Sequence, residues 1–216
     1  MPRRSALLRP LALLALLGAC ATTAAPPPSP LERALGTLRQ RPAWLFEPDR
    51  CPADVMPAAE QKTEMLGDLC VTDLPTCLDR CQARDPSGCY SAALRVQALK
   101  SDEPASEALF LRACRLGSMS GCTNRAAGMT KDGNEGEAAN RCAVRTFQRT
   151  CQANDPWGCT MLGWHLIEGQ GIERDLERAR RSLQQACVRF GQEDPACVRA
   201  MELLEQIDGA QKGKAT

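Results

Sequence analysis

The cysteines of this 216-residue chain recur at a regular spacing, and this spacing constrains the fold more than any other feature. Three pairs have their members eight positions apart and a fourth has them ten apart: Cys81 and Cys89, Cys114 and Cys122, Cys151 and Cys159, and Cys187 and Cys197. The first cysteine of each pair follows the previous one by 33, 37 and 36 residues. This period is the length of a helix–turn–helix repeat, so it predicts stacked helix pairs.

A stripe of alternating side-chain size supports the helical interpretation. Four residues after the second cysteine the side chain is small, and four residues before the next first cysteine it is large: Ala93, Ala126 and Gly163, then Phe110, Phe147 and Leu183. Eight residues before the first cysteine it is small again, as in Ser106, Ala143 and Ala179. Positions four apart share one face of a helix. We therefore expect closely packed helices with large side chains lying over small ones.

The short connections inside the cysteine pairs carry signals for a helix start. Asp85-Pro86 and Asp155-Pro156 precede the second cysteine, and Asp194-Pro195 repeats the pattern. Asp is a favoured N-cap and Pro a favoured first helical residue. A disulfide within each pair would therefore join two antiparallel helices across a tight turn. A disulfide typically stabilises a fold by about 2–4 kcal/mol, and one that closes so small a loop contributes less.

The N-terminus has the pattern of an export signal over residues 1–19. Three arginines precede a short apolar run at residues 11–17, which is too short to span a bilayer. The segment ends Leu-Gly-Ala-Cys20, which resembles the lipobox of bacterial lipoproteins. The resemblance implies cleavage before Cys20, its lipidation, and a lipid anchor in the cell envelope. By resemblance to the sorting of enterobacterial lipoproteins, Ala21 rather than Asp after Cys20 favours the outer membrane.

Export implies an oxidising compartment, where the other 12 cysteines are expected to form six disulfides. Cys51, Cys70, Cys77 and Cys142 lie outside the regular frame and allow three connectivities. Cys70 and Cys77 flank a predicted turn, which favours a Cys70–Cys77 disulfide and leaves Cys51 to pair with Cys142. The sequence does not decide among the three connectivities. Metal binding is disfavoured because the chain lacks Cys-x-x-Cys and has a single His. We expect no metal and no cofactor.

The chain divides into five predicted segments. Residues 1–19 form the signal, 20–30 the lipidated Cys and Pro-rich tether, 31–70 an N-terminal helical cap region, 71–207 the repeat domain and 208–216 a polar tail. In the cap region, Trp44-Leu45-Phe46 is predicted to plug the first repeat. In the last repeat unit, Val198, Met201, Leu204 and Ile207 are predicted to point inward.

Residues 158–197 resemble a Sel1-like repeat, a relative of the tetratricopeptide repeat. The resemblance rests on Leu162-Gly163, the Gly169-x-Gly171 turn, Asp175 and Ala179. With two cysteines eight apart, the chain is similar to the cysteine-rich Sel1-repeat proteins first known from Helicobacter. Residues 89–114 and 122–151 keep the cysteine frame but lack Gly-x-Gly. The resemblance implies an all-α, right-handed α/α solenoid stapled by disulfides.

Several function classes are disfavoured by the sequence. The 27 basic and 26 acidic residues argue against nucleic-acid binding, and any membrane contact is expected through the lipid alone. Cysteine-rich Sel1 proteins have been associated with β-lactam hydrolysis, yet no serine here is followed by Lys three places on. His165 is expected to be a partly exposed helical residue. We therefore expect no catalytic residues.

The predicted function is a protein- or peptide-binding scaffold of the cell envelope, because repeat arrays present extended binding surfaces. The candidate contact residues are Tyr90, Asn124, Arg125, Trp157 and Trp164. Alternatively, Trp157 packs over a turn and Trp164 joins adjacent helices. Two other functions remain open: a β-lactam- or peptidoglycan-fragment-binding protein with weak hydrolase activity, and a structural envelope assembly factor.

Overall fold

The structure is a computed structural model that describes residues 26–47, 49–131 and 136–212, with side chains through residue 210. Every regular element in these ranges is a helix, which confirms the predicted all-helical class. The helices are α1 (Pro30–Arg39), α2 (Pro52–Val55), α3 (Gly67–Thr72), α4 (Leu74–Gln82), α5 (Pro86–Ala98), α6 (Glu103–Arg115), α7 (Met119–Gly128), α8 (Gly136–Gln152), α9 (Pro156–Glu168), α10 (Leu176–Ala186) and α11 (Pro195–Lys212).

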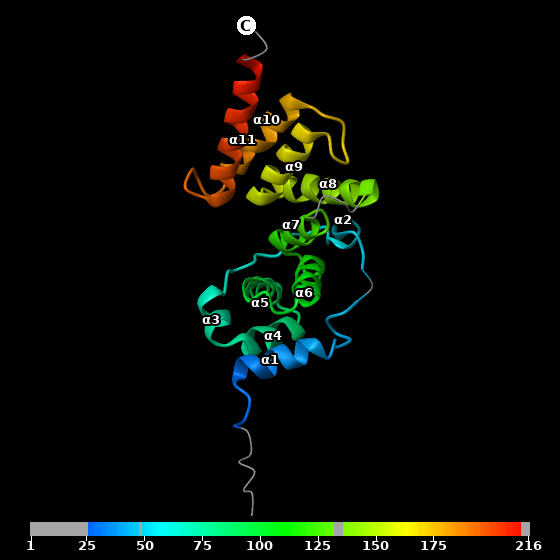
Figure 1. Cartoon of the computed structure of the whole chain (residues 1–216), viewed down its shortest axis with the longest axis vertical. Coiled ribbons are helices and arrows are strands. Elements are labelled where there is room, and N and C mark those ends of the chain that lie inside the picture. The colour runs from blue at the N-terminus through cyan, green and yellow to red at the C-terminus, as the bar shows by residue number, and fades with distance from the viewer. Residues whose placement is uncertain (1–25, 48, 132–135, 213–216) are drawn as a thin grey trace, which may run out of the picture.

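The helices from α4 onward pack in chain order along the long axis of the molecule (Figure 1). Each contacts the next, and α9 also contacts α7 and α11. Helix α1 packs on α4 at one end of the stack, and α11 lies at the other (Figure 1). The predicted signal segment and Cys20 lie outside the described residues. Within the described ranges, no helix has the length and apolarity needed to cross a membrane.

Three of the interhelical turns share one backbone geometry. The residue three places after the first cysteine has a positive φ, and the next residue caps the following helix through its side chain: Arg84 and Asp85, Gly117 and Ser118, Asn154 and Asp155. In each turn the N–H of the positive-φ residue donates to the carbonyl of the first cysteine, at 2.8–3.0 Å. The caps satisfy helix donors that would otherwise have no partner.

Six disulfides are present in the described residues. They are Cys51–Cys142, Cys70–Cys77, Cys81–Cys89, Cys114–Cys122, Cys151–Cys159 and Cys187–Cys197. The last four close the interhelical turns with Cα–Cα distances of 4.4–4.6 Å. The expectation of six disulfides in an all-helical chain is therefore met.

Glycine before the second cysteine permits this close approach. A Cβ built on Gly158 would lie 2.1 Å from Thr150 Oγ1, and one on Gly121 would lie 2.8 Å from Ala113 Cβ. Gly88 is similarly confined, with Arg80 Cβ at 2.6 Å. No Cβ fits between the two helices at these points, so the Gly-Cys dipeptide belongs to the packing of the turn.

The predicted stripe of large and small side chains forms the core. Phe110, Phe147 and Leu183 have no exposed surface. A Cβ on Gly163 would lie 2.5 Å from Leu183 Cδ2, so the large side chain of one helix lies directly on the backbone of its neighbour. Gly163 and Leu183 thus form one contact, in which the absence of a side chain on the glycine makes room for the leucine.

The N-terminal region is less helical than expected. Among the described residues between α1 and α3, the one helix is the four-residue α2, which is followed by Pro57 after one residue. Proline lacks the N–H that a continuing helix requires. We call residues 44–47 and 49–66 the strap. At its start, Leu45 is buried in the cluster of α1, α4 and α5 side chains, with Trp44 and Phe46 packed against it.

The predicted inward face of the last helix is correct in its second half and wrong in its first: Ile207 is buried and Leu204 packs against the core. Val198 and Met201 are 44% and 40% exposed, while Ala196, Ala200, Leu203 and Ile207 are buried. Helix α11 packs against both α9 and α10, and small alanines permit that approach. The helix also continues to Lys212, so the expected polar tail begins as helix, with Asp208 paired to Arg180 at 2.7 Å.

A Gly158→Ala substitution should destabilise the oxidised protein by about 1–3 kcal/mol, because the added methyl overlaps Thr150 in a packed turn. Gly36→Ala in α1 is the matched control, since nothing lies within 4 Å of its added Cβ. That change should stabilise by about 0.5–1 kcal/mol through helix propensity. Urea unfolding of the two variants measures both effects, and a neutral Gly158→Ala would contradict the packing described.

Candidate binding pockets

Two adjoining pockets lie along one side of the helix stack. The central pocket, about 480 Å³, is lined by α5, α6 and α7 and the two loops after α5 and α7, through Val96, Gln97, Lys100, Glu103, Ser106, Glu107, Asn124, Ala127, Gly128 and Lys131. The tryptophan pocket, about 370 Å³, lies between α7, α9 and α11 and is lined by Ala127, Thr130, Lys131, Trp157, Thr160, Met161, Trp164, Arg199 and Leu203. Ala127 and Lys131 line both, so the pockets are neighbours.

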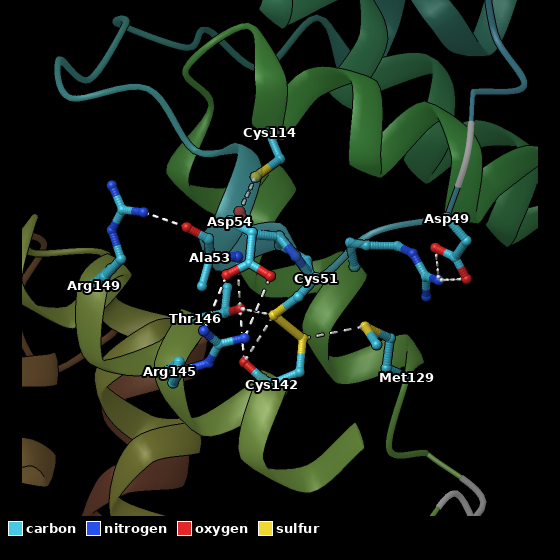
Figure 2. The surroundings of a disulfide bond; sticks show 12 residues. Asp49, Cys51, Ala53, Asp54, Cys114, Met129, Cys142, Arg145, Thr146 and Arg149 are labelled. Carbon is cyan, nitrogen blue, oxygen red and sulfur yellow. Dashed lines mark hydrogen bonds and ion pairs between the residues drawn. A yellow bond between two sulfur atoms is a disulfide. The ribbon is translucent and has the colours of Figure 1, made fainter. Parts of the chain in front are cut away.

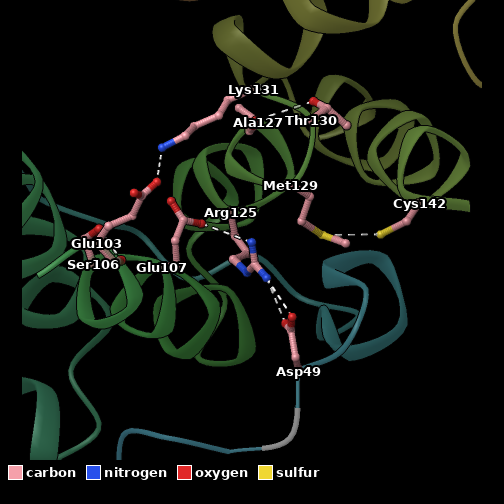
Figure 3. Close-up of polar contacts among 10 residues, drawn as sticks. All are labelled: Asp49, Glu103, Ser106, Glu107, Arg125, Ala127, Met129, Thr130, Lys131 and Cys142. Carbon is pink, nitrogen blue, oxygen red and sulfur yellow. Dashed lines mark hydrogen bonds and ion pairs between the residues drawn. The ribbon is translucent and has the colours of Figure 1, made fainter. Parts of the chain in front are cut away.

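The wall of the central pocket holds an ion-pair network (Figure 3). Lys131 Nζ pairs with Glu103 Oε1. Below it, Arg125 donates to Glu107 Oε2 at 3.1 Å and to both carboxylate oxygens of Asp49 at 2.8 and 3.0 Å. Gly128 leaves room for Glu107, since a Cβ there would lie 2.3 Å from Glu107 Oε2.

Burial raises the pKa of Glu107, although the Arg125 charge and hydrogen bond oppose that shift. Arg125 itself is only 9% exposed. A buried guanidinium is costly unless it is paired, and two carboxylates satisfy this one. The predicted contact residue Arg125 is therefore engaged within the fold, where it connects α6, α7 and the strap.

The tryptophan pocket is mainly apolar with a basic rim. Trp157 is 42% exposed and Trp164 is half-buried, and Met161 and Leu203 complete the apolar wall. Lys131 and Arg199 line the pocket, and their carboxylate partners, Glu103 for Lys131 and Glu202 for Arg199 at 2.7 Å, lie outside its lining. Such a site accommodates an apolar side chain, and exposed tryptophan and arginine are the residue types that anchor protein interfaces.

The other predicted contact residues lie in or near the central pocket. Asn124 lines it and donates from Nδ2 to Ser120 O at 2.8 Å. Tyr90 is half-buried against Phe110, with ring centroids 6.0 Å apart, and lies outside both pocket linings. Burial and the Asp155 charge raise the pKa of Tyr90. The structure therefore brings Asn124, Trp157 and Trp164 to the pockets, and it holds Tyr90 and Arg125 in the fold.

Lys131, Met161 and Arg199 of the pocket walls were not among the predicted contact residues. Lys131 follows α7, and the other two lie on α9 and α11. No motif marks them. These three residues meet because α9 packs against both α7 and α11. The cysteine period alone does not specify that packing.

The expectation of a partly exposed His165 is wrong. The side chain is fully buried between Trp164, in a T-shaped contact at 4.9 Å, and Phe147 at 5.4 Å. Its Nδ1 bonds Gln170 O at 2.9 Å, and its Nε2 has no partner. Burial lowers the pKa of His165. His165 is buried because the turn after α9 folds Gln170 back over the ring.

The described residues contain no cluster of three or more His, Cys, Asp or Glu side chains suited to a metal ion. The 12 described cysteines are all in disulfides. The chain matches no protein-family model, no curated protein and no solved structure.

Because His165 is the single histidine, its proton NMR signal reports one site. We expect the ring to stay neutral in the folded protein as pH falls through about 6.5, where an unfolded histidine gains its proton. The unfolded state then binds more protons, so stability is full above about pH 6.5 and falls below it toward the lowered folded pKa. A ring that titrates near 6.5 in the native protein would contradict this burial.

Proposed function

We propose that the chain is a protein- or peptide-binding scaffold built from Sel1-like repeats and anchored in the bacterial cell envelope by a lipid on Cys20. The observation that carries the proposal is the pair of adjoining pockets along α5, α7, α9 and α11. Extended surfaces lined by successive repeat helices are suited to elongated partners. The tryptophan pocket supplies the anchor site and the central pocket supplies polar groups beside it.

The Sel1-like assignment is supported by the turn between α9 and α10. Gly169 and Gly171 both have positive φ, at 73° and 69°. A Cβ on Gly171 would lie 2.5 Å from the Asn140 carbonyl carbon, so this turn needs glycine for backbone conformation and for space. Asp175 then caps α10 by accepting from Arg178 N at 2.9 Å. A right-handed solenoid is the arrangement we infer for the packed helix pairs.

Selection of displayed peptides on the intact oxidised protein tests the binding function. We expect selected peptides to lose at least about tenfold in affinity with Trp157→Ala, because truncating a central aromatic anchor costs more than about 1.4 kcal/mol. Isothermal titration of each purified peptide measures the loss.

Phe190→Ala is the control, since this aromatic side chain is 61% exposed and lines neither pocket. It should leave the affinities unchanged. Failure to select any peptide, or peptides that depend on Phe190 and not on Trp157, would refute the proposed site.

A further inference from the structure

The strap crosses the helix stack on a row of arginines. We call Arg112, Arg115, Arg125, Arg145, Arg149 and Arg189 the arginine row; all six contact the strap. Two come from α6, one from α7, two from α8 and one from the loop after α10. Successive helices thus present guanidinium groups to one segment that lies far from them in sequence.

The strap is acidic where it meets this row. Over residues 44–66 the sequence has five carboxylates and two basic side chains. Asp49 pairs with Arg125 at 2.8 Å and Asp54 with Arg145 at 3.0 Å. Glu47 pairs with Arg112 and Arg115, and Glu60 pairs with Arg189. Charge complementarity therefore runs along the whole contact and is not confined to one ion pair.

At Ala53 and Met56 the helix stack binds the main chain of the strap; the contacts at Ala53 are drawn in Figure 2. Thr146 Oγ1 accepts from Ala53 N at 3.1 Å, while its own hydroxyl donates to Cys142 O at 3.0 Å. Arg149 donates to Ala53 O and, at 3.3 Å, to Met56 O. Main-chain recognition of this kind does not depend on the identity of the bound side chains.

The side chains at the centre of the contact are small or apolar. Pro52, Ala53 and Met56 are buried, and Met56 packs with Met119 and the Cys114–Cys122 disulfide. One covalent bond, Cys51–Cys142, fixes the strap here across 91 residues of chain. Cys51 is half-buried, whereas both cysteines of the neighbouring Cys114–Cys122 bond are fully buried. This bond is therefore the more accessible of the two to a dissolved thiol.

We propose that the arginine row is a recognition surface for extended acidic segments of a partner protein, and that the strap is its resident occupant. A partner takes the place of the strap once the Cys51–Cys142 bond is open. A dithiol opens the bond by exchange: its first thiolate attacks one cysteine sulfur, and the other cysteine leaves and is protonated. The second thiol then closes the disulfide of the reductant and releases the first cysteine as a thiol. None of the six arginines lines either pocket, and Arg125 alone adjoins one, through its ion pair with Glu107 in the central pocket.

The test uses a fluorescent peptide of residues 47–60 carrying Cys51→Ser, added to the full chain. The receiving protein is the triple variant Asp49→Lys/Cys51→Ser/Asp54→Lys, whose own strap is repelled by the row. Fluorescence anisotropy should show binding at least about tenfold tighter to this variant than to the unmodified oxidised protein. The affinity should weaken as salt is raised, because exposed charges are screened.

Two controls isolate the arginine row. Adding Arg145→Glu and Arg149→Glu to the triple variant should abolish binding, whereas adding Arg178→Glu and Arg180→Glu, the same charge change at sites paired with Asp175 and Asp208, should not. A peptide with Asp49→Lys and Asp54→Lys should not bind. Equal binding of this reversed peptide, or no binding of the acidic peptide at 1 mM (~4 kcal/mol of affinity), would overturn the proposal.

A second measurement does not depend on the variants being well folded. The native protein is treated with dithiothreitol, free thiols are alkylated and identified by mass spectrometry, and hydrogen exchange is followed in the fraction in which Cys51 and Cys142 alone are reduced. The amides of Ala53 and Gln61 should lose protection while α5–α10 keep theirs. Strap amides that stay protected after this bond is reduced would show a fixed structural element and would refute an exchangeable occupant.

Discussion

The close approach of two helices at each cysteine-bridged turn is the contact on which the rest of the structure depends. Disulfides hold the Cα atoms of the paired cysteines 4.4–4.6 Å apart, and glycines before the second cysteine of three pairs leave no room for a side chain between the helices. A positive-φ residue and a side-chain cap complete each of these three turns. Since the turns set how each helix meets the next, they also determine where the pockets form.

The strap adds long-range order to a stack that is otherwise built from neighbouring contacts. In a repeat array each unit contacts only its neighbours, and stability is close to a sum of local terms. Here α2 contacts α6, α7 and α8, and the Cys51–Cys142 bond closes a loop of 91 residues. Longer closed loops restrict the unfolded chain more than short ones. The strap therefore links several helices at once, whereas each turn disulfide links two consecutive helices.

Local patterns in the sequence predicted the parts of the fold that local chemistry determines. The cysteine period, the Asp-Pro starts and the alternation of Phe147 with Ala143 are read within one helix or turn, and the structure has helices and turns at those places. Leu204 and Ile207 were placed correctly on the inward face of α11, whereas Val198 and Met201 were not, because apolar size favoured them over the small Ala196 and Ala200 that are buried there. His165 was misplaced because its burial depends on Gln170 folding back over the ring.

The pockets and the arginine row depend on tertiary arrangement, so only part of them was predictable. Trp157 and Trp164 could be singled out because aromatic residues are rare in this sequence. Lys131 and Arg199 belong to common residue types and lie in no recognisable motif. Arg125 was expected at a binding surface, and the structure shows that its partners are Asp49 and Glu107. The path of a mostly non-helical segment across several helices leaves no periodic signal in its own sequence.

The helix packing is tested most directly by mapping the disulfides of the native protein, through proteolysis without reduction and mass spectrometry of the linked peptides. The structure predicts four linkages across the interhelical turns, Cys70 joined to Cys77, and Cys51 joined to Cys142. A turn cysteine linked outside its own pair would contradict the helix packing. A different partner for Cys142 would contradict the position of the strap.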